Sequence, residues 1–588
     1  MAEDTSGLLK IDRCQKLYHK EKETDDSWKP STGAVIKLLL SIRISGALWS
    51  ILSDTDETEK QWENLHTMFY RDGFPSWRNY PLDSLADVQS FILNSLFFCP
   101  GWFYIKALAQ SKIAVFTLIR LTIGAVCICG EYCAFVAISN RINISTGRYF
   151  LIFTIFSSGM FHASITLSPY TVSMICSFFF IFGLLEDKRW ICYASWIISF
   201  SLGSWPTFFF FLLTDFASTL WRHTLHKKWI GVPLSILMVV LFTHYACCSF
   251  YDELPLFMRT FYKTPYEYLK TIKIGYRPPG TTYYFIQDFI CNWNVAALLA
   301  LVGPLLACKA CWKFQQHRHT WKKVNDVTPI VFLAINSTFW FTMFLTLRRV
   351  ESFMFPMYPN ISLFAALACD AIPRLWHKEG DEPTSGNQGG RKAITDPFIN
   401  RPRNIGHVFV YTLVSFFIVC SLLRINTVYQ SYGSEMDIYK GFHEELNAHE
   451  EFDRFNDPIK LCLGKSSKRF PSSFFMPTEV HDGKMNYRKV EKQIMETNHI
   501  DNLSESSGKI PGYVNLDSCD YVIDIDQPST SVYVDFREMP EQWKSILSLP
   551  YLDADRTDIP SRYFSIPFIS SYFDLRHVTT ITLYRRIV

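Results

Sequence analysis

Acidic side chains crowd a short stretch that follows the first apolar segment, residues 53–66 (SDTDETEKQWENLH). Its carboxylates are Asp54, Asp56, Glu57, Glu59 and Glu63, and Trp62 and His66 lie among them. A carboxylate beside an apolar boundary is partly desolvated, which raises its pKa and makes it a better acceptor for a hydroxyl proton. The stretch is therefore a candidate site for general-base chemistry at a membrane surface. The alternative is a solvated loop between membrane segments, where acidic residues are common.

The same residues raise the question of a metal ion. Asp54-Thr55-Asp56 matches the Asp-x-Asp pattern by which nucleotide-sugar transferases hold Mn²⁺ or Mg²⁺ against a diphosphate. The chain lacks the alternating β/α pattern of a nucleotide-binding fold, and a three-residue match is short. We therefore expect neither a metal ion nor another cofactor at this site.

The composition indicates the kind of protein that must position these groups. The 588 residues are 48% hydrophobic and 16% aromatic, which is too apolar for an ordinary soluble protein. A net charge of +3, without a long basic run, argues against nucleic-acid binding. Most of the 16 cysteines lie in apolar stretches, where a thiol behaves as a small hydrophobic group. Cys308-x-x-Cys311 has no second pair to complete a zinc site, so we interpret it as packing.

Apolar stretches long enough to cross a bilayer, which takes about 20 residues, recur along the first two thirds of the chain. They are 34–52, 91–109, 113–138, 149–168, 170–186, 190–214, 230–250, 291–310, 328–346, 353–372 and 405–425. We therefore expect a polytopic α-helical membrane protein with about eleven transmembrane helices. Residues 33–425 would form this multi-spanning domain, and the Gly- and Pro-containing segment 373–404 would be a flexible linker within it.

The positive-inside rule orients these spans. Lys and Arg gather in three loops, at residues 222–228, 309–323 and 374–392. Alternation of the spans puts all three on the side of the N-terminal tail, residues 1–32, which has no signal-peptide pattern; that side should be cytosolic. The acidic loop 53–90, the loop 251–290, the turn 348–352 and everything after residue 426 then lie on the other side.

The polar tail, residues 426–588, has the pattern of a small α/β domain. Residues 443–455 favour a helix, and residues 521–526, 531–536 and 579–584 alternate as half-buried strands do. Two cysteines of the tail, Cys462 and Cys519, could pair in an oxidising compartment. Sequons at Asn502 in the tail and at Asn143 in a turn predicted on the same side could be glycosylated.

The pattern Asp-x-Asp-Glu-Thr-x-x-x-Trp-Glu-x-x-His, followed by Gly73-Phe74, Trp77 and Pro81, resembles the first luminal loop of a known enzyme family. These are the endoplasmic-reticulum mannosyltransferases of glycosyltransferase family 22, which have the GT-C fold and use dolichyl-phosphate mannose. Further landmarks follow in the family's order at residues 159–164, 203–206, 353–359, 462–465, 469–475, 519–521 and 551–553. Those in the tail resemble the α-1,2-mannosyltransferases of N-glycan precursor assembly.

The resemblance implies an activity and roles for residues. Mannose would pass from dolichyl-phosphate mannose, with inversion, to a dolichol-diphosphate oligosaccharide at the luminal face of the endoplasmic-reticulum membrane, without a metal ion. Asp56 would be the general base, and Glu57 and Asp54 would assist it. The predicted substrate-binding residues are Trp62, Glu63, His66, His162, Arg348, Arg349 and Glu351. For the two arginines the alternative is contact with lipid headgroups, and for His162 it is helix packing.

The chain also departs from the family pattern. Where the family usually has His-Lys-Glu-Glu-Arg, this sequence has Arg348-Arg349-Val350-Glu351-Ser352, and Ala86 replaces an expected Arg. A catalytically silent paralogue that binds lipid-linked glycan, and a sister enzyme of another linkage or of the GPI pathway, therefore remain alternatives. A multi-spanning lipid carrier is a further alternative, although carriers tend to place ionisable groups near mid-membrane and to repeat their halves.

Overall fold

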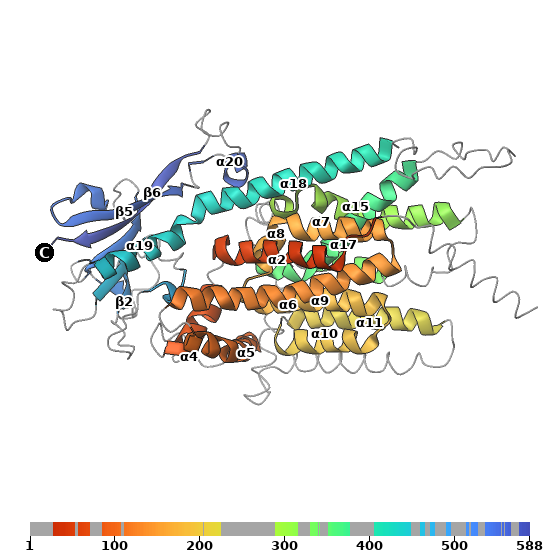
Figure 1. Cartoon of the computed structure of the whole chain (residues 1–588), viewed down its shortest axis with the longest axis horizontal. Coiled ribbons are helices and arrows are strands. Elements are labelled where there is room, and N and C mark those ends of the chain that lie inside the picture. The colour runs from red at the N-terminus through yellow and green to blue at the C-terminus, as the bar shows by residue number, and fades with distance from the viewer. Residues whose placement is uncertain are drawn as a thin grey trace, which may run out of the picture.

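The computed structural model shows a bundle of helices with a small sheet domain at one end (Figure 1). In the helical part it describes residues 28–52, 57–70, 85–107, 111–203, 205–224, 289–315, 330–338, 340–341, 351–376 and 405–448. In the C-terminal part it describes residues 459–464, 471–476, 490–495, 513–514, 516, 519–526, 535–553, 556–557, 559–565 and 576–587. Most of the predicted span 230–250 and loop 251–290 therefore lies outside the described residues.

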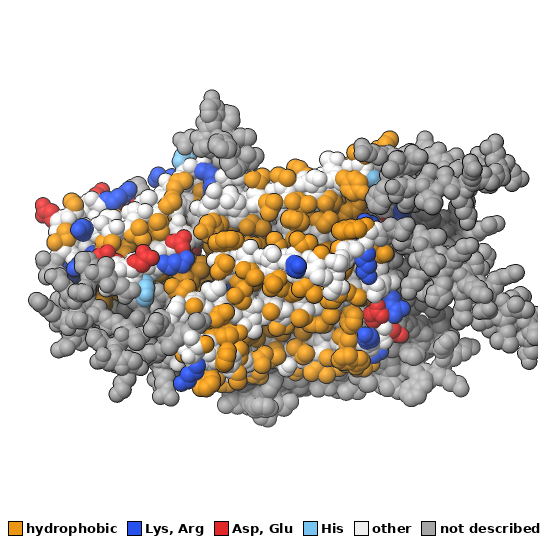
Figure 2. Space-filling model, in the orientation of Figure 1, with side chains coloured by type: hydrophobic (Ala, Val, Ile, Leu, Met, Phe, Trp, Pro, Cys, Tyr) orange, Lys and Arg blue, Asp and Glu red, His pale blue; other side chains and the backbone are white. Residues whose placement is uncertain are grey.

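Apolar helices of different lengths make up the bundle. They are α2 (Thr32–Trp49), α6 (Lys112–Arg141), α7 (Ile144–Phe156), α8 (Ser158–Ala163), α9 (Pro169–Leu185), α10 (Arg189–Ser201), α11 (Trp205–Thr224), α15 (Cys291–Gln315), η4 (Glu351–Met357), α17 (Tyr358–Trp376) and α18 (Ile405–Tyr432). Within the described residues, 5 helical stretches are long and apolar enough to cross a membrane. Hydrophobic side chains cover the middle of the bundle, and charged ones gather toward its ends (Figure 2). The chain is a multi-pass membrane protein.

Helices α2 and α6 run antiparallel. Thr32, at the start of α2, is 3.1 Å from the hydroxyl of Tyr132 late in α6. Ser50, just after α2, accepts a 2.9 Å hydrogen bond from Arg120 early in α6. We call the end of the bundle where α2 ends and α6 begins the domain end, because the C-terminal domain also lies there (Figure 1). The other end is the opposite end.

This arrangement corrects the predicted span 91–109. Helix α5 (Leu85–Ala107) lies between α2 and α6 in the sequence, yet α2 ends and α6 begins at the same end of the bundle. Near its start α5 is tied to the acidic loop by a 2.7 Å hydrogen bond from Gln61 to Ser90. Its apolar side chains either pack on the neighbouring helices or remain exposed, as Trp102 and Phe103 do. Helix α5 therefore does not make the single crossing between α2 and α6 that the sequence predicted.

Two other predicted spans are each divided. The stretch 149–168 breaks at Ser157, whose extended backbone and side-chain acceptor cap the short helix α8. The stretch 190–214 breaks after Ser201, and α10 and α11 lie side by side (Figure 1). Gly203 permits this bend, since a Cβ there would lie 2.4 Å from the Ser173 hydroxyl. Hydropathy averages over such breaks and so did not divide either stretch, although Gly203 and Pro206 interrupt the second one in the sequence.

Two errors in the predicted spans cancel in the count of crossings. Helix α5 removes one predicted crossing, and the division of 190–214 into α10 and α11 adds one. Arg189 at the start of α10 pairs with Asp215 of α11 at 2.5 Å, so α11 returns to the opposite end. The helices leading into the three predicted basic loops thus end where α2 begins. Asn143, however, donates to Asp370 at 3.3 Å near the end of α17. It lies at the opposite end, so its predicted grouping with the acidic loop was wrong.

The C-terminal domain is a mixed sheet with strand order β3-β2-β1-β4-β6-β5. Its strands are β1 (Ile459–Leu463), β2 (Val490–Met495), β3 (Tyr513–Val514), β4 (Tyr521–Ile525), β5 (Trp543–Leu552) and β6 (Val578–Arg586). Strands β1 to β4 pair in parallel, and β6 pairs antiparallel with both β4 and β5. The predicted strands near residues 521 and 579 are confirmed, whereas Phe536–Glu538 forms a 3₁₀ turn.

Helix α19 (Ser434–Ala448) joins the bundle to the sheet. It continues the direction of α18 and packs Phe442 against Tyr521 of β4. The predicted helix 443–455 is confirmed as far as Ala448, and the remainder lies outside the described residues. The predicted pairing of Cys462 with Cys519 is confirmed, with their Cα atoms 5.8 Å apart. It ties the end of β1 to the approach of β4.

Candidate functional site

The acidic stretch is held at both of its ends. Asp54 and Asp56 themselves lie outside the described residues, as do Arg348 and Arg349. The described residues that flank the acidic pair are Ser50 to Leu52 before it and Glu57 onward after it. The contacts that the structure describes at this site are therefore those of the residues that flank Asp54 and Asp56.

Glu57 fixes the end of the stretch that enters the loop. Its carboxylate accepts hydrogen bonds from Trp62 Nε1 at 2.9 Å and from the Leu167 amide at 3.0 Å. The guanidinium of Arg120 also acts on it electrostatically. Residues Thr58–Trp62 form a π-helical turn, a rare local structure that is frequent at functional sites. Glu57 is buried, and these contacts fix the end of the loop, while its predicted assistance to the base stays a prediction.

Trp62 and His66 pack the loop against the C-terminal domain. Trp62 is fully buried, with its ring 4.3 Å from that of Phe116 and 5.9 Å from that of Phe474. His66 lies edge-on to Phe474 at 5.1 Å and beside Tyr70 at 4.8 Å. Both side chains are buried, and the substrate contacts predicted for them stay predictions.

Glu63 joins the loop to the same domain. It begins helix α4 (Glu63–Tyr70), and its carboxylate accepts hydrogen bonds from Ser472 Oγ at 2.9 Å, Ser473 N at 2.7 Å and Ser473 Oγ at 2.6 Å. The serines lie at the short turn η7 (Ser473–Phe475). We call these three hydrogen bonds the Glu63 clasp. The substrate-binding role that the sequence predicted for Glu63 stays a prediction beside this structural role.

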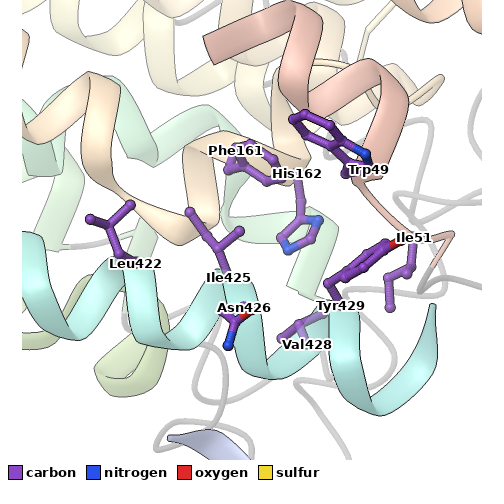
Figure 3. Close-up of a pocket in the computed structure, with 9 residues that line it drawn as sticks. All are labelled: Trp49, Ile51, Phe161, His162, Leu422, Ile425, Asn426, Val428 and Tyr429. Atoms are coloured by element: carbon purple, nitrogen blue, oxygen red, sulfur yellow. The ribbon is translucent and has the colours of Figure 1, made fainter. Parts of the chain in front are cut away.

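A cavity of 240 Å³ lies between the end of α2, helix α8 and helix α18. Its lining residues are Trp49, Ile51, Phe161, His162, Leu422, Ile425, Asn426, Val428 and Tyr429. The His162 ring points toward α18 from α8 (Figure 3). Most of the lining is apolar, which suits a lipid-like or ring-shaped ligand with few polar anchors.

His162 also determines where α2 ends. Its Nδ1 lies 2.6 Å from the Ser50 hydroxyl, and the Ser50 carbonyl accepts the hydrogen bond from Arg120. The chain thus leaves α2 at a fixed point beside the cavity and is fixed again at Glu57. His162 therefore lines the cavity and also packs against the end of α2, which was the alternative role considered for it.

A second polar cluster involves Glu351, which with Ser352 is described in the predicted turn 348–352. Glu351 accepts hydrogen bonds from Asn292 Nδ2 at 2.6 Å and from the Tyr358 hydroxyl at 3.2 Å. Asn292 in turn accepts from Arg424 Nε at 3.5 Å. The sequence analysis missed Arg424, although a lone arginine in an apolar run is a recognisable signal. Its charge acts electrostatically on His162, which brings this cluster close to the cavity.

The described residues hold no group of three His, Cys, Asp or Glu side chains that could bind a metal ion. The polar groups in or near the cavity are instead His162 and Asn426 in its lining, and Arg120, Arg424 and Glu351 on the elements beside it. This set can hold an anion and position a carboxylate, provided that the acidic stretch supplies one.

Comparisons with known proteins address the identity of this site. Residues 34–477 match the model of the Alg9-like mannosyltransferase family. The alpha-1,2-mannosyltransferase algn-9 of Caenorhabditis elegans is 33% identical, over 98% of this chain and 94% of that protein. The human alpha-1,2-mannosyltransferase ALG9 is 26% identical, over 93% of this chain and 88% of that protein.

Among solved structures, the chain is similar to ArnT from Cupriavidus metallidurans bound to undecaprenyl phosphate, with 10% identity and a TM-score of 0.43. That match covers 94% of this chain and 98% of the other. The family match and the C. elegans relative settle the family without it. This chain belongs to the Alg9-like mannosyltransferase family.

Proposed function

We propose that this chain transfers mannose from dolichyl-phosphate mannose, in α-1,2 linkage and with inversion, to a dolichol-diphosphate oligosaccharide during N-glycan precursor assembly. Membership of the family and the names of the relatives support the mannosyltransferase activity. The structural observation that carries the proposal is the double support of the acidic stretch. The stretch leaves Ser50 beside the cavity and is fixed again at Glu57.

In this proposal Asp56 is the general base. The acceptor hydroxyl gives its proton to the Asp56 carboxylate while its oxygen forms a bond to C1 of mannose. The bond from C1 to the phosphate oxygen breaks, and dolichyl phosphate leaves with its electron pair. General-base assistance of this kind is typically worth about 10² to 10⁴ in rate. Asp56 directly precedes Glu57 in the sequence, so the anchoring of Glu57 restricts where the base can lie.

The cavity would receive the donor from the lipid. It lies between α2 and α18, and both helices expose apolar side chains on their outer surfaces, such as Leu48 and Phe416. An isoprenoid chain could therefore stay in the bilayer while its head group reaches the polar side of the cavity. This route agrees with a donor whose lipid is never extracted from the membrane.

We place the domain end in the lumen of the endoplasmic reticulum. The reason is charge: the helices that lead into the three basic loops end at the opposite end, which the positive-inside rule puts in the cytosol. The tail 1–32 would then be cytosolic, and the domain 426–588 would be luminal. The disulfide between Cys462 and Cys519 fits an oxidising compartment.

The direct test is transfer by purified protein. Wild type, Asp56→Asn and a control, Asp437→Asn, are incubated with dolichyl-phosphate mannose and chitobiosyl-lipid acceptors of defined mannose number. Asp437 is a suitable control because it lies on α19 in an exposed pair with Lys440. We expect transfer by wild type and the control, loss in Asp56→Asn, and release of the product mannose by an α-1,2-specific mannosidase.

Other results would point elsewhere. Product that resists the α-1,2 mannosidase would indicate a sister enzyme of another linkage. Folded wild-type protein that binds the acceptor and transfers nothing would indicate a silent paralogue, with Val350 and Ser352 as the residues to restore. Near-normal transfer by Asp56→Asn would remove Asp56 from the role of base.

A further inference from the structure

We propose that Arg424 is the residue that binds the phosphate of the polyprenyl-phosphate donor and leaving group. The inference rests on the proposed function for the identity of the donor, but the chemistry it needs is only a phosphate monoester or diester on a lipid. The sequence pattern had indicated Arg348 and Arg349 for this role, and both lie outside the described residues.

The first observation is the position of Arg424 on α18. The residues that follow it, Ile425, Asn426 and Val428, line the cavity. The guanidinium is close enough to act electrostatically on His162, whose ring lies in the same cavity. Arg424 itself is not among the lining residues, so it adjoins the cavity through its neighbours on α18.

The second observation is that Arg424 lacks a counter-ion within the described part of the chain. Its single hydrogen bond there is the long one from Nε to the neutral amide of Asn292, at 3.5 Å. Its guanidinium carbon lies 5.1 Å from the ring of Tyr563, a cation–π contact that leaves the N–H edges unused. A partly buried cation in a membrane protein is costly unless an anion compensates it.

The third observation is that Asn292 links Arg424 to the carboxylate of Glu351. The amide of Asn292 stands between the two charges, because it accepts from Arg424 with Oδ1 and donates to Glu351 with Nδ2 at 2.6 Å. Glu351 is further engaged by the hydroxyl of Tyr358. The cluster therefore orients the guanidinium through a neutral group and leaves its Nη atoms for another partner.

The backbone around this cluster is held firmly. Asn294 has a positive φ of 47°, which an L-residue with a side chain rarely adopts, and its amide donates to Ser421 Oγ at 3.2 Å. Ser421 is one helical turn before Arg424 on α18. The start of α15 and this part of α18 are thus locked together, which fixes Asn292 relative to the guanidinium. Such strain is typical of sites where position matters.

The chemistry fits a phosphate better than another anion. A guanidinium stays charged and presents two parallel N–H groups, which match two phosphate oxygens. When the glycosidic bond breaks, negative charge grows on the phosphate that leaves. A fixed cation that strengthens its contact as this charge grows would lower the barrier. Arg424 would then act on the leaving group, opposite in charge to the base at Asp56.

The test measures binding rather than transfer. The probe is a short-chain polyprenyl phosphate, titrated by calorimetry into purified full-length protein in nanodiscs of neutral lipid. Wild type is compared with Arg424→Gln, Arg424→Lys and the control Arg556→Gln, whose side chain is 65% exposed and pairs with Asp553 in the C-terminal domain. We expect Arg424→Gln to weaken binding by about 10- to 100-fold, since a charge-assisted bidentate contact is lost. Arg424→Lys should weaken it less, and Arg556→Gln not at all.

Two further arms identify what the site recognises. The uncharged polyprenol should bind weakly and equally to wild type and Arg424→Gln. Phosphatidic acid, added as competitor, should not displace the probe at matched concentration. Equal competition by phosphatidic acid would mean a general headgroup contact and would overturn the proposal as stated, as would unchanged probe binding by Arg424→Gln.

The design separates this inference from the proposed function. Arg424-dependent probe binding by a wild-type protein that transfers no mannose would sustain the inference and overturn the function. Mannose transfer with normal probe binding in Arg424→Gln would do the reverse. Thermal unfolding and gel filtration show whether each variant is folded, and if Arg424→Gln is not, the decision falls to Arg424→Lys, for which wild-type affinity and kcat would overturn the proposal.

Discussion

The acidic loop and the largely apolar cavity beside it both lie at the domain end, and they differ in how the polar groups in and near them are used. In the loop, the carboxylates of Glu57 and Glu63 each accept at least two hydrogen bonds from the protein, and Trp62 and His66 are enclosed by aromatic rings. Around the cavity, Arg424 has one long hydrogen bond within the described residues. The difference separates a frame, whose bonds are complete, from a site that a ligand can complete.

The largest expected effect is at Asp56, and it tests whether this residue is catalytic or only supports the loop. Asp56→Asn should lower kcat by about 10² to 10⁴. It should leave KM for the donor and the thermal unfolding temperature near wild type, because Asp56 is proposed to act in the transition state alone. Steady-state kinetics and a melting curve check this. A variant that melts early would instead show that Asp56 belongs to the frame.

Glu57→Ala should reduce stability and activity together. It removes the acceptor for Trp62 Nε1 and the Leu167 amide and leaves both donors buried, at a cost of about 1–3 kcal/mol for each. We expect the free energy of unfolding in detergent to fall by about 2–5 kcal/mol on this basis. Glu57→Gln, which keeps an acceptor oxygen, is the matched control and should recover more than half of the loss. Wild-type stability in Glu57→Ala would mean that the loop is not fixed there.

Glu63→Ala removes the Glu63 clasp and should loosen the contact between the acidic loop and the C-terminal domain. Loss of the acceptor for Ser472 and Ser473 should cost about 1–3 kcal/mol, since the serine hydroxyls can turn to new partners while the Ser473 amide cannot. Limited proteolysis should then release the C-terminal domain faster than in wild type. Ser545→Ala, at an exposed pair with Ser548 within that domain, is a control that should leave the cleavage rate unchanged.

The smallest effect is expected at His162. His162→Phe removes the 2.6 Å contact with Ser50 and keeps a ring in the cavity, so stability should fall by about 1 kcal/mol. The rate should fall severalfold through a less well fixed end of α2. A loss of 10² or more in a folded variant would contradict this positioning role, because losses of that size belong to groups that transfer protons.

The sequence supports the fold better than the site. Hydropathy located the helices, but it could not show whether the apolar helix α5 crosses between α2 and α6. It also averages over the breaks at Ser157 and after Ser201, where capping and close packing decide the geometry, although Gly203 and Pro206 mark the second break in the sequence. The basic loops still indicated the orientation, since those errors compensate.

For the acidic loop, the residue types suggested catalytic or substrate-binding roles. Their burial in the structure shows that they also hold the loop in place. A glutamate beside a tryptophan and a histidine suggested a sugar site, and nothing local showed that Ser472 would fill the Glu63 carboxylate from about 400 residues away. Arg424 was visible in the sequence as an isolated cation between Leu423 and Ile425. Its significance came only with the neighbours that the fold gives it, Asn292 and His162.

The Glu63 clasp also has a consequence for how the protein is made. Its partners are separated by 409 and 410 residues, so the loop that carries the acidic stretch is synthesised long before the domain that secures it. At about 5–20 residues per second, the interval is roughly 20–80 s. During that time the loop lies on the membrane surface without its cover. A ribosome that stalls before residue 472 would therefore leave a fully inserted bundle whose loop is never secured.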